Sequence, residues 1–200
     1  MPASFVVTGA AQGIGRAVAE RLARDGHVVV LDADGDAASW IATHERISMV
    51  VGDARDESIA ALAADAAERE GPLAGWVNNA AVFRDRALHK VPVTEVLEVI
   101  ELNLGLAVTG CATAVRRFLA SGRSGAIVNV SSHQAQRPVP GALLYATAKA
   151  AIEGLTPCRT TRGGRRRGRA PDLRGGELRQ RRDRAHRRRP SRPRAGPRSP

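Results

Sequence analysis

The chain has 200 residues and a formal net charge of +11 at pH 7, and that charge is spread very unevenly. Residues 1–156 carry 14 Arg and Lys against 17 Asp and Glu, a net charge of −3, whereas residues 157–200 carry 17 Arg against 3 acidic residues, a net charge of +14. The first part is mildly acidic, which excludes a uniformly basic nucleic-acid-binding protein.

Residues 157–200 lack the side chains that build a core. They contain two Leu and no Val, Ile, Phe, Met, Trp or Tyr. Such a composition cannot bury enough apolar surface to offset the entropy lost on folding. We expect a folded domain over residues 1–156, followed by a disordered, Arg-rich tail.

The cysteines and the apolar runs bear on where the protein works. Cys111 and Cys158 stand apart without the spacing of a metal or redox site, which predicts ordinary thiols, a reducing compartment and no metal site. The apolar residues 5–7 lead at once into glycines, which indicates a strand rather than a signal peptide. No stretch approaches the length of a membrane span, so we expect a cytoplasmic protein without a membrane partner.

Short, Val-rich runs alternate with longer amphipathic segments along residues 1–156. The runs are bounded by Gly or polar residues and predict strands at 4–8, 27–32, 47–51, 75–78 and 125–131. The segments between them predict helices at 14–24, at 56–70 and from 93 into the region of 119. This alternation predicts an α/β fold with a parallel sheet covered on both faces, whose ligands lie beyond the carboxyl ends of the strands.

A glycine-rich loop, Thr-Gly-Ala-Ala-Gln-Gly-Ile-Gly, lies between the first strand and the first helix. Glycines spaced in this way permit a tight turn, a close approach to a pyrophosphate and close packing of helix on strand. Glycines also mark many ordinary turns, but the position before a helix N-terminus favours a dinucleotide site. The predicted cofactor-binding residues of this loop are Gly9, Gln12, Gly13, Ile14 and Gly15.

Asp32 ends the second strand, 17 residues after Gly15. A carboxylate at this place accepts hydrogen bonds from the adenosine ribose and repels a 2′-phosphate, which favours NAD over NADP. Gln12 and residues 33–36 supply no basic group for such a phosphate. Without the glycine-rich loop, a solvated turn would be the better interpretation of Asp32.

Polar residues also follow the third and fourth strands. Asp53 either caps the next helix or contacts the adenine, and capping is the simpler interpretation. Asn78 and Asn79 either tie neighbouring loops together through their amides or contact a ligand.

Ser132, Tyr145 and Lys149 form the most specific pattern. Ser131 and Ser132 stand at the end of the fifth strand, Tyr145 follows 13 residues after Ser132, and Lys149 lies one helical turn beyond Tyr145. A nearby ammonium group favours the phenolate, which predicts a lowered pKa of Tyr145 and an acid or base near neutrality. A Tyr and a Lys four residues apart are in themselves usually a surface pair.

Together these motifs resemble the short-chain dehydrogenase/reductase family. The resemblance runs from about residue 5 to residue 156 and rests on the glycine-rich loop, Asn-Asn-Ala, Val-Asn-Val-Ser-Ser and Tyr-x-x-x-Lys, in the family's order. It implies a Rossmann-like, doubly wound fold, a nicotinamide cofactor, a small-molecule alcohol or ketone as substrate and, for the intact family, a homo-oligomer.

The resemblance also implies roles for single residues. Tyr145 would be the general acid/base, Ser132 would orient the substrate, Lys149 would hold the cofactor ribose and lower the pKa of Tyr145, and Asn103 would hold a water for proton relay. The positions that would line the adenosine end are Asp53, Ala54 and Asn79, and the further predicted cofactor-binding residues are Ala80, Tyr145 and Lys149.

Two departures from the family bear on activity. Ala81 stands where the family most often has glycine. The family's sixth and seventh strands and its substrate-covering loop have no counterpart in residues 157–200, and Pro157 interrupts the last helix. We therefore expect a sheet that is incomplete at its C-terminal edge, a reading-frame shift after Thr156, a doubtful oligomer, weak NAD binding and little or no turnover.

The alternative from another class is a dinucleotide-binding domain fused to an Arg-rich arm that binds nucleic acid. The tail has no aromatic residues to stack on bases, which makes a nucleic-acid partner the weaker hypothesis. Before Tyr145, four residues are candidates for the substrate side: His133, Gln134, Gln136 and Leu144.

Overall fold

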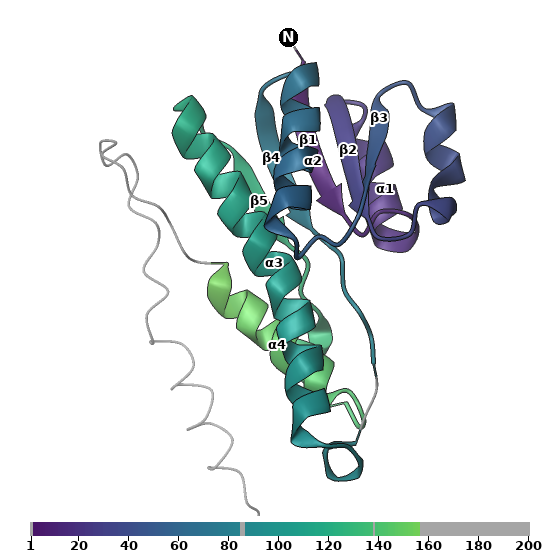
Figure 1. Cartoon of the computed structure of the whole chain (residues 1–200), viewed down its shortest axis with the longest axis vertical. Coiled ribbons are helices and arrows are strands. Elements are labelled where there is room, and N and C mark those ends of the chain that lie inside the picture. Colours follow the sequence, from purple (N-terminus) through teal and green to yellow (C-terminus); the bar gives the residue numbers. More distant parts are fainter. Residues whose placement is uncertain (1, 85–86, 138, 157–200) are drawn as a thin grey trace, which may run out of the picture. The chain divides into compact units, whose positions relative to one another are not determined.

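The computed structural model describes residues 2–84, 87–137 and 139–156, with the backbone alone at residues 36–38. These residues belong to one compact unit. Strands and helices alternate along the chain, as Figure 1 shows. Residues 157–200 lie outside the described part, and so do the predictions made for them: the disordered tail, the shifted reading frame and the nucleic-acid arm.

The sheet has five parallel strands in the order β3-β2-β1-β4-β5. Their bounds are Ala3–Thr8 for β1, Gly26–Asp32 for β2, Ile47–Val51 for β3, Leu73–Asn78 for β4 and Ala126–Asn129 for β5. The prediction of a parallel, Rossmann-like sheet is confirmed. The chain moves outward from β1 to β3 and then returns to the other side of β1, so the strand order reverses between β1 and β4.

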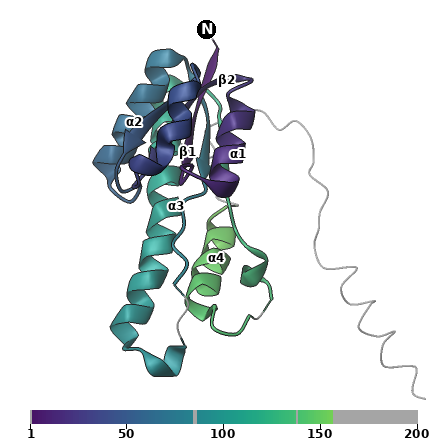
Figure 2. The same cartoon turned by 90° about the vertical axis from the view of Figure 1, so that its right-hand side faces the viewer.

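Alternate residues of the strands build the two faces of the sheet, as the period of two requires. Val6 and Leu31 pack in one cluster with α2 (Glu57–Glu70) and α3 (Val93–Ser121), whereas Val7 and Val30 pack in another with α1 (Gly13–Leu22). Figure 2 shows α1 and α2 on opposite sides of β1. Helices on both faces explain why the strands are almost continuously apolar.

Helix α3 corrects the expectation that no stretch reaches the length of a membrane span. It has 29 residues, and by length and apolar composition alone it is the one helix in the described part of the chain that could cross a membrane. It packs instead against α2 and β4, and it buries the polar side chains of Asn103 and Thr113. We interpret α3 as a core helix that covers the sheet.

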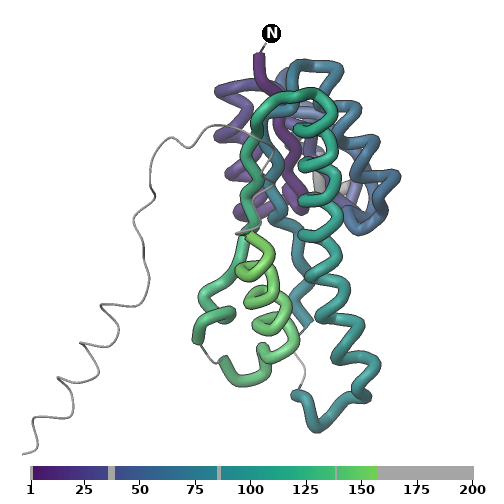
Figure 3. The backbone as a smooth tube through the Cα atoms, turned by 90° about the vertical axis from the view of Figure 1, so that its left-hand side faces the viewer, coloured from purple at the N-terminus to yellow at the C-terminus, as the bar shows by residue number. Residues whose placement is uncertain are grey.

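Helix α4 (Leu143–Leu155) follows the short 3₁₀ helix η3 (His133–Ala135) and packs along α3. Leu144 contributes to this contact, in a cluster with Val96 and Val99 of α3. Figure 3 shows the two helices side by side. Because α4 is fixed in this way, the side chains it carries near β5 have defined positions.

Three local expectations differ from the structure. β5 ends at Asn129, two residues before the predicted Ser131, because the chain turns toward η3 there. The 3₁₀ helices η1 (Asp36–Thr43) and η2 (Leu88–Lys90) were not predicted. Their sequences are too short to show a helical period, and η1 depends on a distant contact: Trp40 and Ile41 are buried against the cluster around β1 and β2.

Candidate active site

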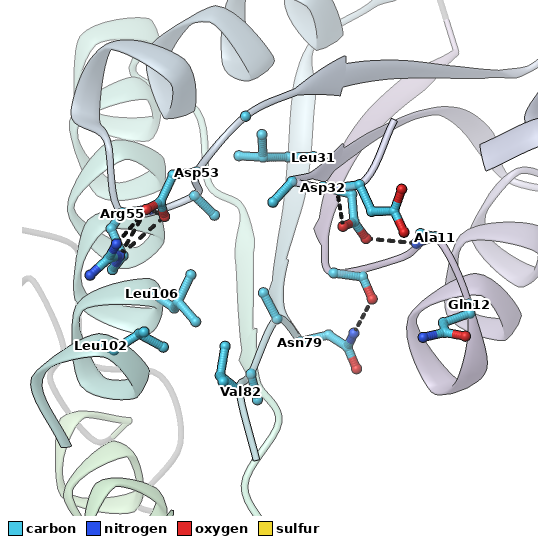
Figure 4. Close-up of a pocket in the computed structure, with 17 residues that line it drawn as sticks. Ala11, Gln12, Leu31, Asp32, Asp53, Arg55, Asn79, Val82, Leu102 and Leu106 are labelled. Atoms are coloured by element: carbon cyan, nitrogen blue, oxygen red, sulfur yellow. Dashed lines mark hydrogen bonds and ion pairs between the residues drawn. The ribbon is translucent and has the colours of Figure 1, made fainter. Parts of the chain in front are cut away.

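The carboxyl ends of β1 to β4 and the middle of α3 enclose a cavity of ≈ 420 Å³ (Figure 4). It lies where the strand order reverses, the place at which sheets of this kind bind ligands. Its lining residues are Gly9, Ala11, Gln12, Leu31, Asp32, Ala33, Asp34, Gly52, Asp53, Ala54, Arg55, Asn79, Ala80, Ala81, Val82, Leu102 and Leu106.

The structure brings most of the predicted cofactor residues to this cavity. Seven of them line it: Gly9, Gln12, Asp32, Asp53, Ala54, Asn79 and Ala80. The other loop residues, Gly13, Ile14 and Gly15, do not; they form the first turn of α1, where Ile14 is exposed and Gly15 is buried. The catalytic candidates Asn103, Ser132, Tyr145 and Lys149 also lie outside the lining.

Two glycines let the loop lie directly on the end of β4. Gly9 has a positive φ of 65°, and a Cβ there would lie 2.5 Å from the Cα of Ala80. A Cβ at Gly15 would collide with the carbonyl oxygen of Gly9 and lie 2.5 Å from Nδ2 of Asn79. A side chain at either position would push the loop away, so glycine is required at both for reasons of space.

Asp32 holds the loop as well as lining the cavity. Its Oδ2 accepts a hydrogen bond from the backbone N–H of Ala11 at 2.8 Å, and its Oδ1 accepts one from the N–H of Asp34 at 3.1 Å. Figure 4 shows the Asp32–Ala11 bond at the rim of the cavity. Asp32 is therefore more than a solvated turn residue.

Asp53 does not cap α2, contrary to the simpler interpretation of the sequence. The cap is Asp56, which accepts from the N–H groups of Ser58 and Ile59. Asp53 instead pairs with Arg55, whose Nη2 lies 2.6 Å from Oδ2, and the hydrogen bonds from Arg55 lower the pKa of Asp53. Asp53 thus places a carboxylate at the cavity, and part of its hydrogen-bonding capacity is used by Arg55.

Asn79 and Asn78 tie loops together, one of the two interpretations left open by the sequence. Nδ2 of Asn79 donates to the carbonyl oxygens of Thr8 at 3.1 Å and Gly9 at 2.7 Å, which fixes the start of the glycine-rich loop on β4. Nδ2 of Asn78 donates to Oδ1 of Asn129 on β5 at 2.8 Å. Asn79 also lines the cavity, and its predicted contact with a ligand stays a prediction.

Tyr145 and Lys149 lie together on α4, close to the end of β5. The Nζ of Lys149 lies 5.4 Å from the centroid of the Tyr145 ring and donates to the carbonyl oxygen of Val130 at 2.7 Å. Ser131 joins the same strand end to α4, since its hydroxyl donates to Oε1 of Glu153 at 3.0 Å. The i, i+4 pair is therefore built into the fold and is not an ordinary surface pair.

Ser132 caps η3, where its Oγ accepts from the N–H of Gln134 at 3.3 Å. The other candidates for the substrate side differ in their surroundings. Leu144 is almost completely buried between α4 and α3 and belongs to the core, and Gln136 donates from Nε2 to Glu153. His133 is exposed and Gln134 is partly buried, and both remain candidates.

The pKa directions correct one expectation about the tyrosine. Burial raises the pKa of Tyr145 and lowers the pKa of Lys149, because removal from water disfavours the charged form of each group. The predicted lowering of the tyrosine pKa by Lys149 is therefore wrong for the protein without a cofactor. The ammonium is directed to the carbonyl of Val130 rather than to the phenol oxygen.

Asn103 also has a different surrounding from the one expected. Its Oδ1 accepts from the N–H of Val82 at 2.9 Å, and its Nδ2 donates to the carbonyl oxygens of Val82 and Val99, each at 3.0 Å. Both amide hydrogens are thus used, and the side chain is 1% exposed. In this structure the side chain of Asn103 fixes the segment after β4 on α3; the predicted role in holding a relay water stays a prediction.

Sequence reasoning missed three residues at the site: Trp40, Arg55 and Phe83. The Nε1 of Trp40 donates to the carbonyl oxygen of Ala11 at 2.9 Å, and the rings of Phe83 and Tyr145 meet edge to face with centroids 5.1 Å apart. Val82, which precedes Phe83, lines the cavity, whereas Phe83 itself does not. None of the three belongs to a motif, although Trp40 and Phe83 are among the few aromatic residues of the chain.

A parallel sheet with a glycine-rich loop and a cavity at the point of strand reversal defines a Rossmann-like fold. The comparison with protein families is more specific, since the family model described as short chain dehydrogenase matches residues 4–164. The chain belongs to the short-chain dehydrogenase/reductase family of oxidoreductases.

Curated relatives agree with this assignment. The chain is 35% identical over 160 residues to a 3beta-hydroxysteroid dehydrogenase of Mediterraneibacter gnavus, which covers 76% of this chain and 57% of the relative. It is 33% identical over 164 residues to the 3-oxoacyl-[acyl-carrier-protein] reductase FabG of Staphylococcus aureus, covering 78% and 66%. The chain thus spans about three fifths of the length of these two relatives.

Solved structures show the same fold. LigO from Sphingobium sp. strain SYK-6, in its apo form, superimposes with a TM-score of 0.70 at 26% identity, over 76% of this chain and 59% of LigO. A short-chain dehydrogenase from Streptomyces avermitilis gives a TM-score of 0.68 at 28% identity, over 78% and 58%.

Proposed function

We propose that this chain is an NAD-dependent oxidoreductase that interconverts an alcohol and a ketone by hydride transfer. The observation that carries the proposal is that residues 82 and 83 lie between the two groups: the first lines the cavity and the second contacts a catalytic candidate. Val82 lines the cavity, Phe83 follows it, and the ring of Phe83 packs on Tyr145, which shares a helix face with Lys149. The two relatives are named for unlike substrates, a hydroxysteroid and an oxoacyl carrier protein, so the proposal extends to the alcohol–ketone pair and no further.

The residues of the cavity fit a dinucleotide. Gly9, Ala11 and Gln12 line the cavity, so the backbone of the loop would face a pyrophosphate bound there. The N-terminus of α1 follows at Gly13 and supplies unpaired N–H groups and a positive dipole end. Asp32 and Asp53 would bind the adenosine half through its ribose and its adenine.

The charges of the lining favour NAD over NADP. Three carboxylates, from Asp32, Asp34 and Asp53, line the cavity against one guanidinium, that of Arg55, which is paired with Asp53. A 2′-phosphate beside Asp32 would meet a like charge without a basic partner. The reaction would need only the hydride chemistry of the nicotinamide ring from the cofactor.

The chain's own residues would handle the proton. In reduction, Tyr145 would donate its phenolic proton to the ketone oxygen, and in oxidation it would take the proton from the alcohol. The hydroxyl of Ser132 would donate a hydrogen bond to the same oxygen and hold it in place. Lys149 would bind the ribose, and its positive charge would then favour the phenolate of Tyr145.

The partner proposed for this site is a small-molecule alcohol or ketone. We also propose a cytoplasmic location. The support for it comes from the sequence, in which Cys111 and Cys158 lack the spacing of a metal or redox site.

The test compares binding and chemistry in wild-type protein and in Tyr145→Phe. We expect calorimetry to show tighter binding of NAD than of NADP by wild type, and an unchanged NAD affinity for Tyr145→Phe, since only a hydroxyl is lost. Oxidation of a panel of secondary alcohols should fall by about 10²- to 10⁴-fold in the variant.

Because the sequence predicts weak NAD binding and little turnover for this chain, the affinity measurement is the primary result. Equal or tighter binding of NADP would contradict the assignment of the cofactor. An alcohol oxidation that is as fast in Tyr145→Phe as in wild type would exclude the tyrosine as acid/base.

A further inference from the structure

The backbone of Ala11, inside the glycine-rich loop, is held at both its N–H and its carbonyl oxygen by side chains outside the loop. Its N–H donates to Oδ2 of Asp32 at 2.8 Å, and its carbonyl oxygen accepts from Nε1 of Trp40 at 2.9 Å. We propose that Trp40 is a positioning residue for the cofactor: by fixing the Ala11 carbonyl, it holds the loop in the conformation that receives the pyrophosphate. This inference rests on the proposed function.

Trp40 suits this role because the only polar group of its side chain, the indole N–H, has a single partner, the carbonyl oxygen of Ala11. The indole N–H can donate but not accept, and its acceptor lies 29 residues earlier in the chain. Trp40 is 8% exposed and Ala11 6%, so water has little access to either residue. Loss of the donor would leave a buried carbonyl oxygen without this partner, which favours a rearranged loop.

The ring of Trp40 also contacts the far end of the loop. The guanidinium carbon of Arg16, the first residue after the last loop glycine, lies 4.9 Å from the ring centroid of Trp40. Arg16 is itself held by Glu20, since its Nε lies 2.9 Å from Oε1. Trp40 therefore touches the chain both inside the loop, at Ala11, and directly after it, at Arg16.

Packing holds Trp40 itself in place. It lies in the cluster formed by β1, β2 and α1, together with Val7, Ala19 and Val30. Its ring also meets that of His44 edge to face, with centroids 5.5 Å apart. The short helix η1 thus delivers a rigid donor to the loop. If Trp40 had a purely structural role, its replacement would change only the stability of the protein. In the proposed role, its replacement also changes the amide exchange of the loop and the affinity for the cofactor.

The experiment compares Trp40→Phe with Trp76→Phe. Trp76 is the other tryptophan of the chain; it is also buried, with 1% exposed against 8% for Trp40, and donates from Nε1 to Oδ1 of Asn78 at 2.8 Å, in the cluster on the opposite face of the sheet. Both variants lose one indole N–H and some ring volume. Only Trp40→Phe removes a bond to the glycine-rich loop.

The first measurement is amide hydrogen exchange at residues 11–13 in the protein without cofactor. We expect exchange to be faster by between about 2- and 12-fold in Trp40→Phe, the factor that one lost hydrogen bond produces, and unchanged in Trp76→Phe. The second is the dissociation constant by calorimetry. NAD and ADP-ribose should bind more weakly to Trp40→Phe by a similar factor, and adenosine, which lacks the pyrophosphate, should be affected less.

Equal exchange and equal ADP-ribose affinity in the two variants would overturn the role of Trp40. If wild type binds neither NAD nor ADP-ribose, the proposed function fails, and so does the role of Trp40 toward a cofactor; the exchange rates then still show whether Trp40 fixes the loop. If Trp40→Phe does not fold, β-(3-benzothienyl)alanine at position 40 keeps the ring shape without the N–H. With this residue, the exchange and affinity changes should persist, and their absence would refute the proposal.

Discussion

Tyr145 is the only tyrosine of the chain, so its ionisation can be followed without ambiguity through the absorbance of tyrosinate. Burial raises the pKa of Tyr145, and the ring of Phe83, with its centroid 5.1 Å away, is a described neighbour that excludes water from it. Phe83 is itself 56% exposed, so its side chain can be shortened at little cost to the core. The pair therefore offers a direct test of how the site sets the acidity of its acid/base candidate.

We expect Phe83→Ala to lower the pKa of Tyr145 toward its ordinary value. The sign follows from the cause: water admitted beside the phenol stabilises the phenolate, which is the charged form, and so eases loss of the proton. A titration of tyrosinate absorbance measures the change, with Phe118→Ala as the matched control, since Phe118 packs in the cluster under α2. A pKa of Tyr145 that rises or stays constant in Phe83→Ala would contradict this account.

At the scale of single residues, the sequence predicts which side chains lie close together where they are only a few positions apart. Tyr145 and Lys149 lie one helical turn apart, and their proximity on α4 follows from that spacing. The contacts of Trp40 with Ala11 and of Asn103 with Val82 join residues 29 and 21 positions apart, and no local pattern indicates them. The direction of the Tyr145 pKa was predicted wrongly for the same reason: burial and the Val130 acceptor are tertiary features.

At the scale of secondary-structure elements, α3 crosses β4 at unusually short range. A Cβ at Gly110 of α3 would collide with Oδ1 of Asn78 and lie 2.5 Å from Nε1 of Trp76. These two side chains are already bonded to each other and are buried, so neither can move aside at low cost. Close contact between helix and strand at this point thus depends on the missing side chain.

We therefore expect Gly110→Ala to lower the free energy of unfolding by about 1–3 kcal/mol through overpacking. The control is Gly154→Ala in α4, where a Cβ would meet nothing within 4 Å. That change should raise the stability by about 0.5–1 kcal/mol, because alanine loses less backbone entropy than glycine in a helix. Urea unfolding of both variants measures the difference, and a Gly110→Ala protein as stable as wild type would show that α3 can shift away from β4.

The strands and long helices could be predicted because each carries its own apolar run or period, as Ile47–Val51 and Glu57–Glu70 show. The end of β5 and the existence of η1 could not. β5 ends where the chain turns toward η3, and η1 forms where Trp40 finds the cluster around β1. Both depend on packing against segments that are distant in the sequence.

At the scale of the whole molecule, the uneven charge predicts that cofactor binding and polyanion binding belong to different parts of the chain. All residues that line the cavity precede residue 107, and Tyr145 and Lys149 precede residue 156. Residues 1–156 have a net charge of −3 and residues 157–200 one of +14. We propose that the first part contains the whole cofactor site as one domain, and that any binding to polyanions comes from the second.

A chain that ends after Thr156 tests this division. Its NAD affinity should equal that of the full chain within about twofold, since every residue that lines the cavity is kept. The full chain should bind heparin at low salt and release it steeply as salt rises, because each neutralised phosphate or sulfate releases counterions, and the short chain should not bind it. A short chain that folds, by circular dichroism, yet has lost NAD binding would show that residues 157–200 contribute to the site. Heparin binding retained by the short chain would place the polyanion site among residues 1–156, despite their net negative charge.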